Sequence, residues 1–421
     1  MSSAKKQTPL FDWHKAHGAN IVEFGDYMMP IWYASARNEH LAVVSQAGLF
    51  DTSHMATLRV FGKDAYELLQ WCFTRNLDSC VGKDNAPLTE GKCVYGAILN
   101  EQGHAIDDCL VYKIQDGEYM VEVNASQGGP VAKHLAEQAK GRDVRVVDLT
   151  DQIGKIDIQG PASVKIMAKL LKNPDQVFDK LPYFSAKGHF DPASPLAAQV
   201  QLLDGTPMLL SRSGYTGEVG FELFVERVHT VKLWEALMAA GQEQGLTPCG
   251  LAARDSLRTG AVLPLSHQDI GPWIFTRHPW PFALPLAAGS EGFTKDFLGR
   301  AALERATDAP YTLTFVGHDL RKVDGHEAKV FHNGQEIGTI LTCATDMAIG
   351  RHEGRIYSIA SPDKPEGLVI KGLCCGFMKV KAKLEPGTTV ELRDAKRAIP
   401  VVIETDVRPD RTARKALKSF F

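Results

Sequence analysis

Two adjacent aspartates, Asp107 and Asp108, follow a turn and open an apolar segment that reads IDDCLVY. Because successive side chains of a strand point to opposite faces, we expect one aspartate to be solvated and the other to enter a pocket beside Leu110 and Tyr112. A carboxylate in such a pocket can accept or relay a proton. In the alternative interpretation, both carboxylates cap the turn through their own backbone.

A second candidate is the segment SRSGYTGEVGFE, which runs from Ser211 to Glu222 and contains three glycines and two carboxylates, Glu218 and Glu222. Glycines of this kind let the backbone approach a ligand closely. The spacing lacks the Gly-Lys-Ser/Thr of a phosphate-binding P-loop and the GxGxxG turn of a dinucleotide site. A β-turn between two strands explains the pattern equally well.

The third candidate is GLAARDSLR, residues 250–258, which is typical of a helix start. Arg254 and Asp255 in this helix form either a structural ion pair or a pair that faces a substrate. Other common catalytic patterns are missing, because GxSxG, HExxH and CxxC do not occur. The adjacent Cys374 and Cys375 would point in opposite directions on a strand, so we expect no zinc site and no other metal.

The elements that must position these residues follow from hydrophobic periodicity and turn residues. Apolar spacing predicts helices over 39–46, 64–73, 131–138, 162–171 and 228–244, and strands over 57–61, 93–99, 108–114, 119–123, 155–159, 207–211 and 220–225. The order of strands and helices indicates an α+β domain with an antiparallel sheet. Beyond about residue 310, short β-like runs separated by Asp-Gly, Asn-Gly and Pro-Gly turns predict a small barrel or sandwich.

Length and composition restrict the class of protein further. The 421 residues exceed the usual size of one hydrophobic core, so two or three domains are expected. The 47 basic and 50 acidic residues give a net charge of −3, which does not favour binding to nucleic acid. No apolar run is long enough to span a bilayer and the N-terminus lacks an apolar signal region, so we expect a cytoplasmic protein without membrane contact.

These fragments together resemble one family, the aminomethyltransferases of the glycine cleavage system and the related folate-dependent demethylases. The resemblance lies in seven blocks in the family's order, from TPLFDWHKAHGANIVEFGDYMMPIWY and EHLAVVSQAGLFDTSHM, through VYGAILNEQGHAIDDCLVY, VNAS and DIQGPAS, to SRSGYTGEVGFEL and GLAARDSLRTGAVLPL.

The resemblance implies an α+β fold of three domains in a cloverleaf around a central folate pocket. The first domain would be discontinuous and comprise residues 1–50 and 146–300. Residues 51–145 would form the second domain with the catalytic hairpin, and residues 301–421 a β-rich, barrel-like third domain. Asp108 aligns with the family's essential carboxylate and Arg254 with the arginine of its ARD motif, both as catalytic residues. Cofactor-binding roles carry over to Tyr95, Leu110, Tyr112, Asn124, Tyr215 and Glu222.

The implied activity is tetrahydrofolate-dependent transfer of an aminomethyl group from a lipoylated carrier of the H-protein kind, which yields methylenetetrahydrofolate and ammonia. The alternative is a tetrahydrofolate-dependent demethylase acting on a small N-, O- or S-methylated compound. A third class, the non-catalytic folate module of iron–sulfur assembly, carries a KGCYxGQE motif that this sequence lacks.

The sequence departs from the family pattern in three places before residue 300. Val219 replaces an aspartate in GYTGEDGFE, and Thr259 and Gly260 follow Leu257-Arg258 where the family has LRLEAG. The segment TRHPWPFALPL introduces His278, Trp280 and Phe282, an aromatic wall that favours an enclosed small donor. Alternatively, Trp280 and Phe282 fill a domain interface.

Overall fold

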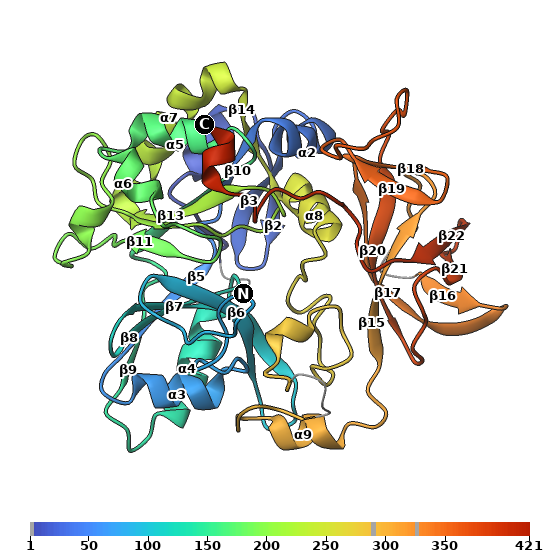
Figure 1. The fold of residues 1–421 in the computed structure, drawn as a ribbon, viewed down its shortest axis with the longest axis horizontal. Helices are drawn as coiled ribbons and strands as arrows, with labels where there is room; N and C mark the ends of the chain where they lie inside the picture. The colour runs from blue at the N-terminus through green and yellow to red at the C-terminus, as the bar shows by residue number, and fades with distance from the viewer. Residues whose placement is uncertain (1–3, 288–291, 325–327) are drawn as a thin grey trace.

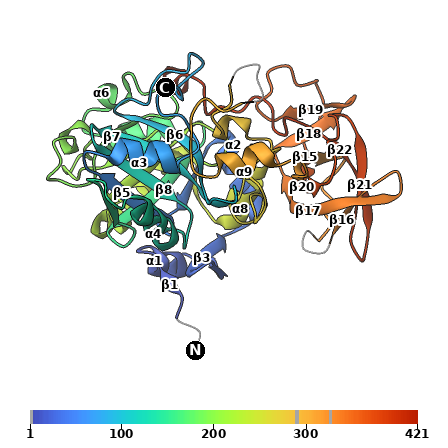
Figure 2. The same ribbon diagram turned by 90° about the horizontal axis from the view of Figure 1, so that it is seen from below.

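Three large β-sheets, each with its own apolar core, organise the chain (Figure 1). The computed structural model describes residues 4–287, 292–324 and 328–421. Two of the sheets carry helices and the third closes into a barrel, as the predicted α+β fold with a C-terminal barrel requires. Figure 2 shows the barrel to one side of the two α+β sheets, with α8 (Leu251–Gly260) and α9 (Arg300–Arg305) between them.

The first sheet has six strands in the order β11-β12-β13-β10-β4-β14. Its pairs are antiparallel except β14 with β4, which is parallel. The strands are β4 (Ala47–Asp51), β10 (Ile153–Gln159), β11 (Ala186–Gly188), β12 (Leu209–Ser211), β13 (Gly220–Glu226) and β14 (Leu246–Cys249).

Helices whose apolar side chains share the core of this sheet are α5 (Ser163–Leu170), α6 (Pro174–Phe178) and α7 (Thr230–Gly241). A 3-10 turn, Gln242–Gln244, extends α7 to the end of the predicted helix, where Gly245 adopts a φ of 69°. The N-terminal part adds α1 (Phe11–Ala16), α2 (Ala36–Ser45) and a small sheet of β1 (Lys6–Gln7), β3 (Tyr27–Trp32) and β2 (Asn20–Phe24).

The second sheet is inserted between β4 and β10 and has the order β6-β7-β8-β5-β9. All of its pairs are antiparallel, which confirms the prediction from the sequence. Its strands are β5 (Ala56–Phe61), β6 (Lys92–Leu99), β7 (Ala105–Gln115), β8 (Glu118–Val123) and β9 (Arg145–Asp148), and its helices are α3 (Ala65–Cys72) and α4 (Gly128–Gln138).

The third sheet is a closed barrel in the order β15-β20-β17-β16-β21-β22, which confirms the predicted small barrel. Its strands are β15 (Tyr311–Gly317), β16 (Lys329–His332), β17 (Gln335–Asp346), β20 (Leu373–Val380), β21 (Thr389–Arg393) and β22 (Ala398–Ile403), with a separate hairpin of β18 (Ile349–His352) and β19 (Arg355–Ser358).

The segment after β22 leaves the barrel and returns to the first sheet, where the C-terminus lies beside α5 and α7 (Figure 1). Leu417 is 7% exposed and belongs to the core of the six-stranded sheet. The guanidinium of Arg212, which follows β12, donates to the carbonyl of Ala413 at 3.2 Å. Contacts of the last residues therefore hold the segment that follows the barrel against the first sheet.

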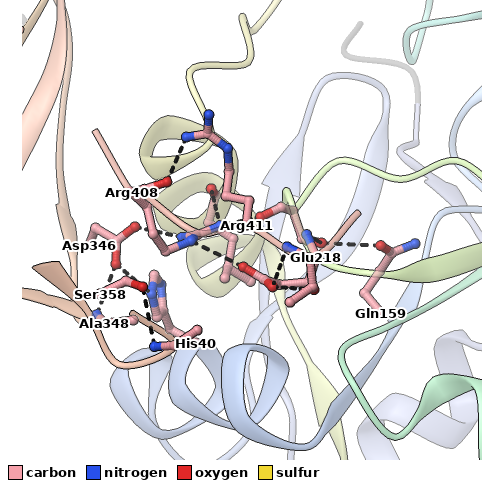
Figure 3. A network of polar contacts seen from close by, with 12 residues as sticks. His40, Gln159, Glu218, Asp346, Ala348, Ser358, Arg408 and Arg411 are labelled. Atoms are coloured by element: carbon pink, nitrogen blue, oxygen red, sulfur yellow. Dashed lines mark hydrogen bonds and ion pairs between the residues drawn. The ribbon is translucent and has the colours of Figure 1, made fainter. Parts of the chain in front are cut away.

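A buried polar network also joins the barrel to the first sheet (Figure 3). Asp346, at the end of β17, pairs with Arg408 at 2.5 Å and with His40 Nε2 of α2 at 3.0 Å. Arg408 also pairs with Glu218 at 3.2 Å, and each of these side chains is at most 1% exposed. Because buried charges require partners, this network sets the position of the barrel against α2 and α8.

Candidate functional site

A cavity of ≈ 870 Å³ lies where the three sheets meet. Its wall includes Asp108 and Leu110 of β7, Glu222 of β13, Arg254 of α8 and Ala344 of β17. A site of this size is in the range that holds a cofactor or drug-sized ligand. Of the residues predicted to act, all but Tyr112 lie in this wall: Tyr95, Asp108, Leu110, Asn124, Tyr215, Glu222 and Arg254.

Asp108 faces the cavity from the hairpin of β6 and β7, where it pairs in register with Ala97. It is 8% exposed and accepts hydrogen bonds from the hydroxyl of Tyr95 and from the Asn124 side-chain amide, each at 2.8 Å. Burial raises the pKa of Asp108. The carboxylate is thus oriented by two donors while it remains accessible from the cavity.

Asp107 is not solvated, so the expectation that one aspartate would face water was wrong. It is 0% exposed and accepts from the backbone N–H of Asn124 at 2.8 Å and from the hydroxyl of Ser266 at 2.6 Å. The segment around Ser266 comes from 159 residues further along the chain and covers this face of the strand. Burial and the charge of Asp108 raise the pKa of Asp107 to about 7, since two adjacent buried carboxylates do not ionise independently.

A second group of charges lies around Lys155 of β10, which is 3% exposed. Its ammonium pairs with Glu222 at 2.5 Å and with Asp157 at 3.6 Å, and it also contacts Glu122. Burial opposes the charge of Lys155, but the three carboxylates outweigh it and raise its pKa. The pKa of Glu122 rises to about 7, chiefly through burial. This ammonium therefore holds Glu222 in place at the cavity wall.

Glu222 still has a free acceptor, because its Oε2 is buried and has no hydrogen-bond partner within the protein. A buried carboxylate oxygen that lacks a partner loses several kcal/mol of solvation unless a ligand or water supplies a donor. Because Glu222 lines the cavity, a ligand there with N–H groups on one edge would fit this oxygen.

Arg254 and Asp255 form no ion pair with each other, although both line the cavity. The Arg254 guanidinium binds Asp157 at 2.8 Å, while Asp255 pairs with Arg258 at 2.7 Å. On α8, residues three apart share a face and adjacent residues do not, which separates Arg254 from Asp255. The guanidinium of Arg254 also lies 4.8 Å from the ring centroid of Tyr215, whose hydroxyl donates to the carbonyl of Pro264. Arg254 and Tyr215 therefore form one stacked part of the wall.

Tyr112 is the predicted site residue that the described cavity wall does not include. It is 1% exposed and belongs to an apolar cluster with Phe224, and its hydroxyl lies 3.4 Å from Glu122 Oε2. Tyr112 thus contacts the group of charges around Lys155 through Glu122 and does not line the cavity.

Three residues of the site were missed from the sequence: Lys155, Glu122 and Ser266. Lys155 and Asp157 interrupt the apolar strand IGKIDIQ, and Glu122 interrupts EYMVEV. Charged residues in otherwise buried strands are rare unless they are paired, so these interruptions could have indicated a buried charged site from the sequence alone. Ser266 gives no such signal.

Of the three residues of the predicted aromatic wall, His278 and Trp280 do not line the cavity and Phe282 does. Trp280 is 1% exposed, packs against Phe377 with ring centroids 5.4 Å apart, and donates its indole N–H to the carbonyl of Val262 at 2.7 Å. Phe282 is 51% exposed and lines the cavity beside Tyr95. Trp280 therefore fills an interface, and Phe282 alone belongs to the wall.

Within the ranges that the structure describes, no group of three or more histidine, cysteine, aspartate or glutamate side chains could hold a metal ion. In the same ranges, no helix has both the length and the apolar character needed to cross a membrane.

Comparisons with known proteins indicate the same family over most of the chain. The family model described as the GCVT N-terminal domain matches residues 10–275. A protein named aminomethyltransferase from Streptomyces coelicolor is 36% identical over 368 residues, which cover 85% of this chain and 90% of the relative. One of the same name from Geobacillus sp. is 34% identical over 356 residues, which cover 83% and 89% of the two chains.

Among solved structures, the glycine cleavage system aminomethyltransferase T from Bartonella henselae superposes with a TM-score of 0.73. The identity is 24%, and the match covers 95% of this chain and 96% of that one. At this identity the likeness concerns the fold, which the two proteins share along nearly their whole length.

Proposed function

Because the chain belongs to the aminomethyltransferase family, we propose that it transfers an aminomethyl-derived carbon from a lipoylated carrier protein to tetrahydrofolate and releases ammonia. The observation that carries this proposal is that Asp108 and Glu222 line the same cavity, where Glu222 Oε2 has no hydrogen-bond partner within the protein.

The wall residues fit a reduced pterin. The ring has an edge of N–H donors, and Glu222 offers a buried oxygen without a partner in the protein. Lys155 holds that carboxylate in place through its contact at 2.5 Å. Tyr215 and Leu110 add the apolar surface that a flat ring requires. We infer that these residues hold and orient the pterin.

Tetrahydrofolate, when bound, supplies the nucleophilic N5 that accepts the carbon. Asp108 stabilises positive charge that develops near its carboxylate, and the hydroxyl of Tyr95 and the amide of Asn124 keep the carboxylate aimed into the cavity. Asp107, held in place by Ser266, lies behind the wall and shares the side-chain amide of Asn124 with Asp108, so it helps to position that amide. Arg254 is held in the cavity wall by its ion pair with Asp157.

The demethylase alternative rested on an aromatic wall around a small donor. Trp280 does not reach the cavity wall, so one of the two rings that were to enclose such a donor is absent from it. The relatives that match most of the chain also carry the name of the transferase. We therefore propose the lipoylated carrier as the donor.

The test is a reconstituted reaction with tetrahydrofolate and a lipoyl carrier loaded with the aminomethyl group. We expect ammonia and methylenetetrahydrofolate in equal amounts, and neither product when the carrier is omitted. Formation of methyltetrahydrofolate from a small methylated donor, without ammonia, would contradict the proposal.

A further inference from the structure

Two cysteine thiols of the barrel are in contact across neighbouring strands. Cys343 lies on β17 and Cys374 on β20, and their Sγ atoms are 3.5 Å apart. Cys343 pairs in register with Gly376, and Cys374 lies two residues before Gly376, so the two side chains share one face of the sheet. Gly376 has no side chain to separate the two sulfurs. Closing them to a disulfide requires an approach of about 1.5 Å.

The two thiols differ in access. Cys343 lines the large cavity and is the one cysteine of the eight that is not buried. Cys374 is 0% exposed and belongs to the apolar interior of the barrel. A reagent in the cavity therefore meets Cys343, whereas Cys374 offers it no exposed surface. This is the arrangement of an attacking thiol and a resolving thiol.

The surroundings of Cys343 favour its thiolate. The hydrogen bond between the two sulfurs lowers the pKa of Cys343 in spite of burial, and the backbone N–H of Val323 and the ammonium of Lys322 act in the same direction. The same hydrogen bond and burial raise the pKa of Cys374. Cys109 lines the same cavity, but burial and the neighbouring Asp107 and Asp108 raise the pKa of its thiol well above the ordinary value. Cavity access alone thus does not produce a reactive cysteine here.

We propose that Cys343 and Cys374 form a thiol–disulfide exchange site that takes small disulfide compounds from the cavity. The Cys343 thiolate attacks one sulfur of the disulfide, which forms a mixed disulfide and expels one thiolate. That thiolate takes the proton of Cys374, and the Cys374 sulfur then attacks Cys343 Sγ and expels the second thiolate, which is protonated by solvent. The ligand disulfide is reduced by two electrons, and the two cysteines are oxidised to one disulfide.

This inference is independent of the proposed one-carbon transfer, because neither sulfur has a role in that reaction. It concerns the barrel side of the cavity, where Lys322 and Thr345 also line the wall. Loss of transferase activity would not test it, and its own test measures thiols.

The experiment treats the fully reduced, native chain with cystamine, a small aliphatic disulfide, and follows free thiols and disulfide-linked peptides by mass spectrometry. We expect the loss of two thiols and one linked pair, Cys343 with Cys374. Cys374→Ala should instead retain a stable mixed disulfide on Cys343, and Cys343→Ala should retain all of its thiols.

A matched control is Cys80, which lies outside the described cavity wall and whose pKa is raised by burial to about 11. Cys80→Ser should react as the unmodified protein does. For each unit by which the pKa of a thiol is lower, its thiolate population rises about tenfold. The lower nucleophilicity of that thiolate offsets roughly half of the gain on a logarithmic scale. Cys343 should therefore react at least about tenfold faster than Cys80 in the native protein. Unreacted protein, linkage of other cysteines, or capping of Cys343 in the unmodified protein without closure onto Cys374 would each overturn the proposal.

Discussion

Asp108 combines three properties that few carboxylates of this chain share, since it is buried, held by two donors and accessible from the cavity. Asp108→Asn preserves the shape of the side chain and removes its charge. We expect affinity for a folate analogue to change little and turnover to fall by about 10²–10⁴. Calorimetry and ammonia release measure the two quantities. Asp116→Asn, whose side chain is 89% exposed at the next turn, is the control and should retain full turnover.

Glu222 should act on binding rather than on turnover. Glu222→Ala leaves the donors of a bound pterin edge without a partner, which costs roughly 1–3 kcal/mol of binding free energy. The same calorimetric titration measures the loss. Glu226→Ala, on the same strand but outside the described cavity wall, serves as the comparison. Equal affinity in the Glu222 and Glu226 variants would remove Glu222 from the site.

Asp107 gives the fold a measurable dependence on pH. Its folded pKa of about 7 lies above the ordinary value of 3.8, so the folded state holds a proton that the unfolded chain releases. The stabilisation is complete below about pH 4 and is lost as the pH rises through 7. Urea titrations at pH 5, 6 and 7 should show the free energy of unfolding declining as the pH rises, and the decline belongs to the coupled pair of Asp107 and Asp108. Asp107→Asn should flatten that decline, and an unchanged slope would contradict the assignment.

At the level of elements, the position of α8 depends on Gly250, which precedes the helix and leaves no room for a side chain. A Cβ at this position would lie 2.4 Å from the backbone carbonyl group of Ile31, at the end of β3. Because α8 carries Arg254, a shift of its first turn would also disturb the pair with Asp157.

We expect Gly250→Ala to destabilise the protein by about 1–3 kcal/mol, because a methyl group without space forces the backbone apart. Gly129→Ala in α4 is the matched control, since a Cβ there meets nothing within 4 Å. That change should be neutral or stabilising by about 0.5–1 kcal/mol. Thermal or urea unfolding of both variants measures the difference. Equal stability would show that the backbone of β3 shifts enough to accommodate the methyl group.

At the level of the whole molecule, the network of Figure 3 joins the barrel to the rest of the chain. Burial alone would raise the pKa of Asp346, but Arg408 and His40 outweigh it and hold the pKa below its ordinary value. The carboxylate is therefore charged at neutral pH, and its stabilisation is lost only in acid.

Asp346→Asn should destabilise the fold by about 3–5 kcal/mol, because it leaves the charge of Arg408 without its partner at 2.5 Å. Denaturant unfolding at neutral pH provides the measurement. Asp406→Asn breaks an exposed pair with Arg411 and should cost less than about 1 kcal/mol. If the two variants were equally stable, the buried network would not hold the barrel in place.

The sequence by itself determined most of the local structure around the site. Alternation and turn residues predicted the hairpin of β6 and β7, and Gly250 with the following apolar spacing predicted α8. These features depend on neighbours within a few residues, which is why a local pattern suffices. The family resemblance then named seven residues that the fold brings into one cavity wall.

Only the tertiary structure decided what covers each face and which charges meet. Ser266 buries Asp107 from 159 residues away, and Lys155 meets Glu222 across 67 residues. No local period encodes such contacts. Strand alternation separates two faces, but burial of either face depends on which distant segment packs against it. For the same reason the contact of Cys343 with Cys374 exists only once β17 and β20 are paired in the closed barrel.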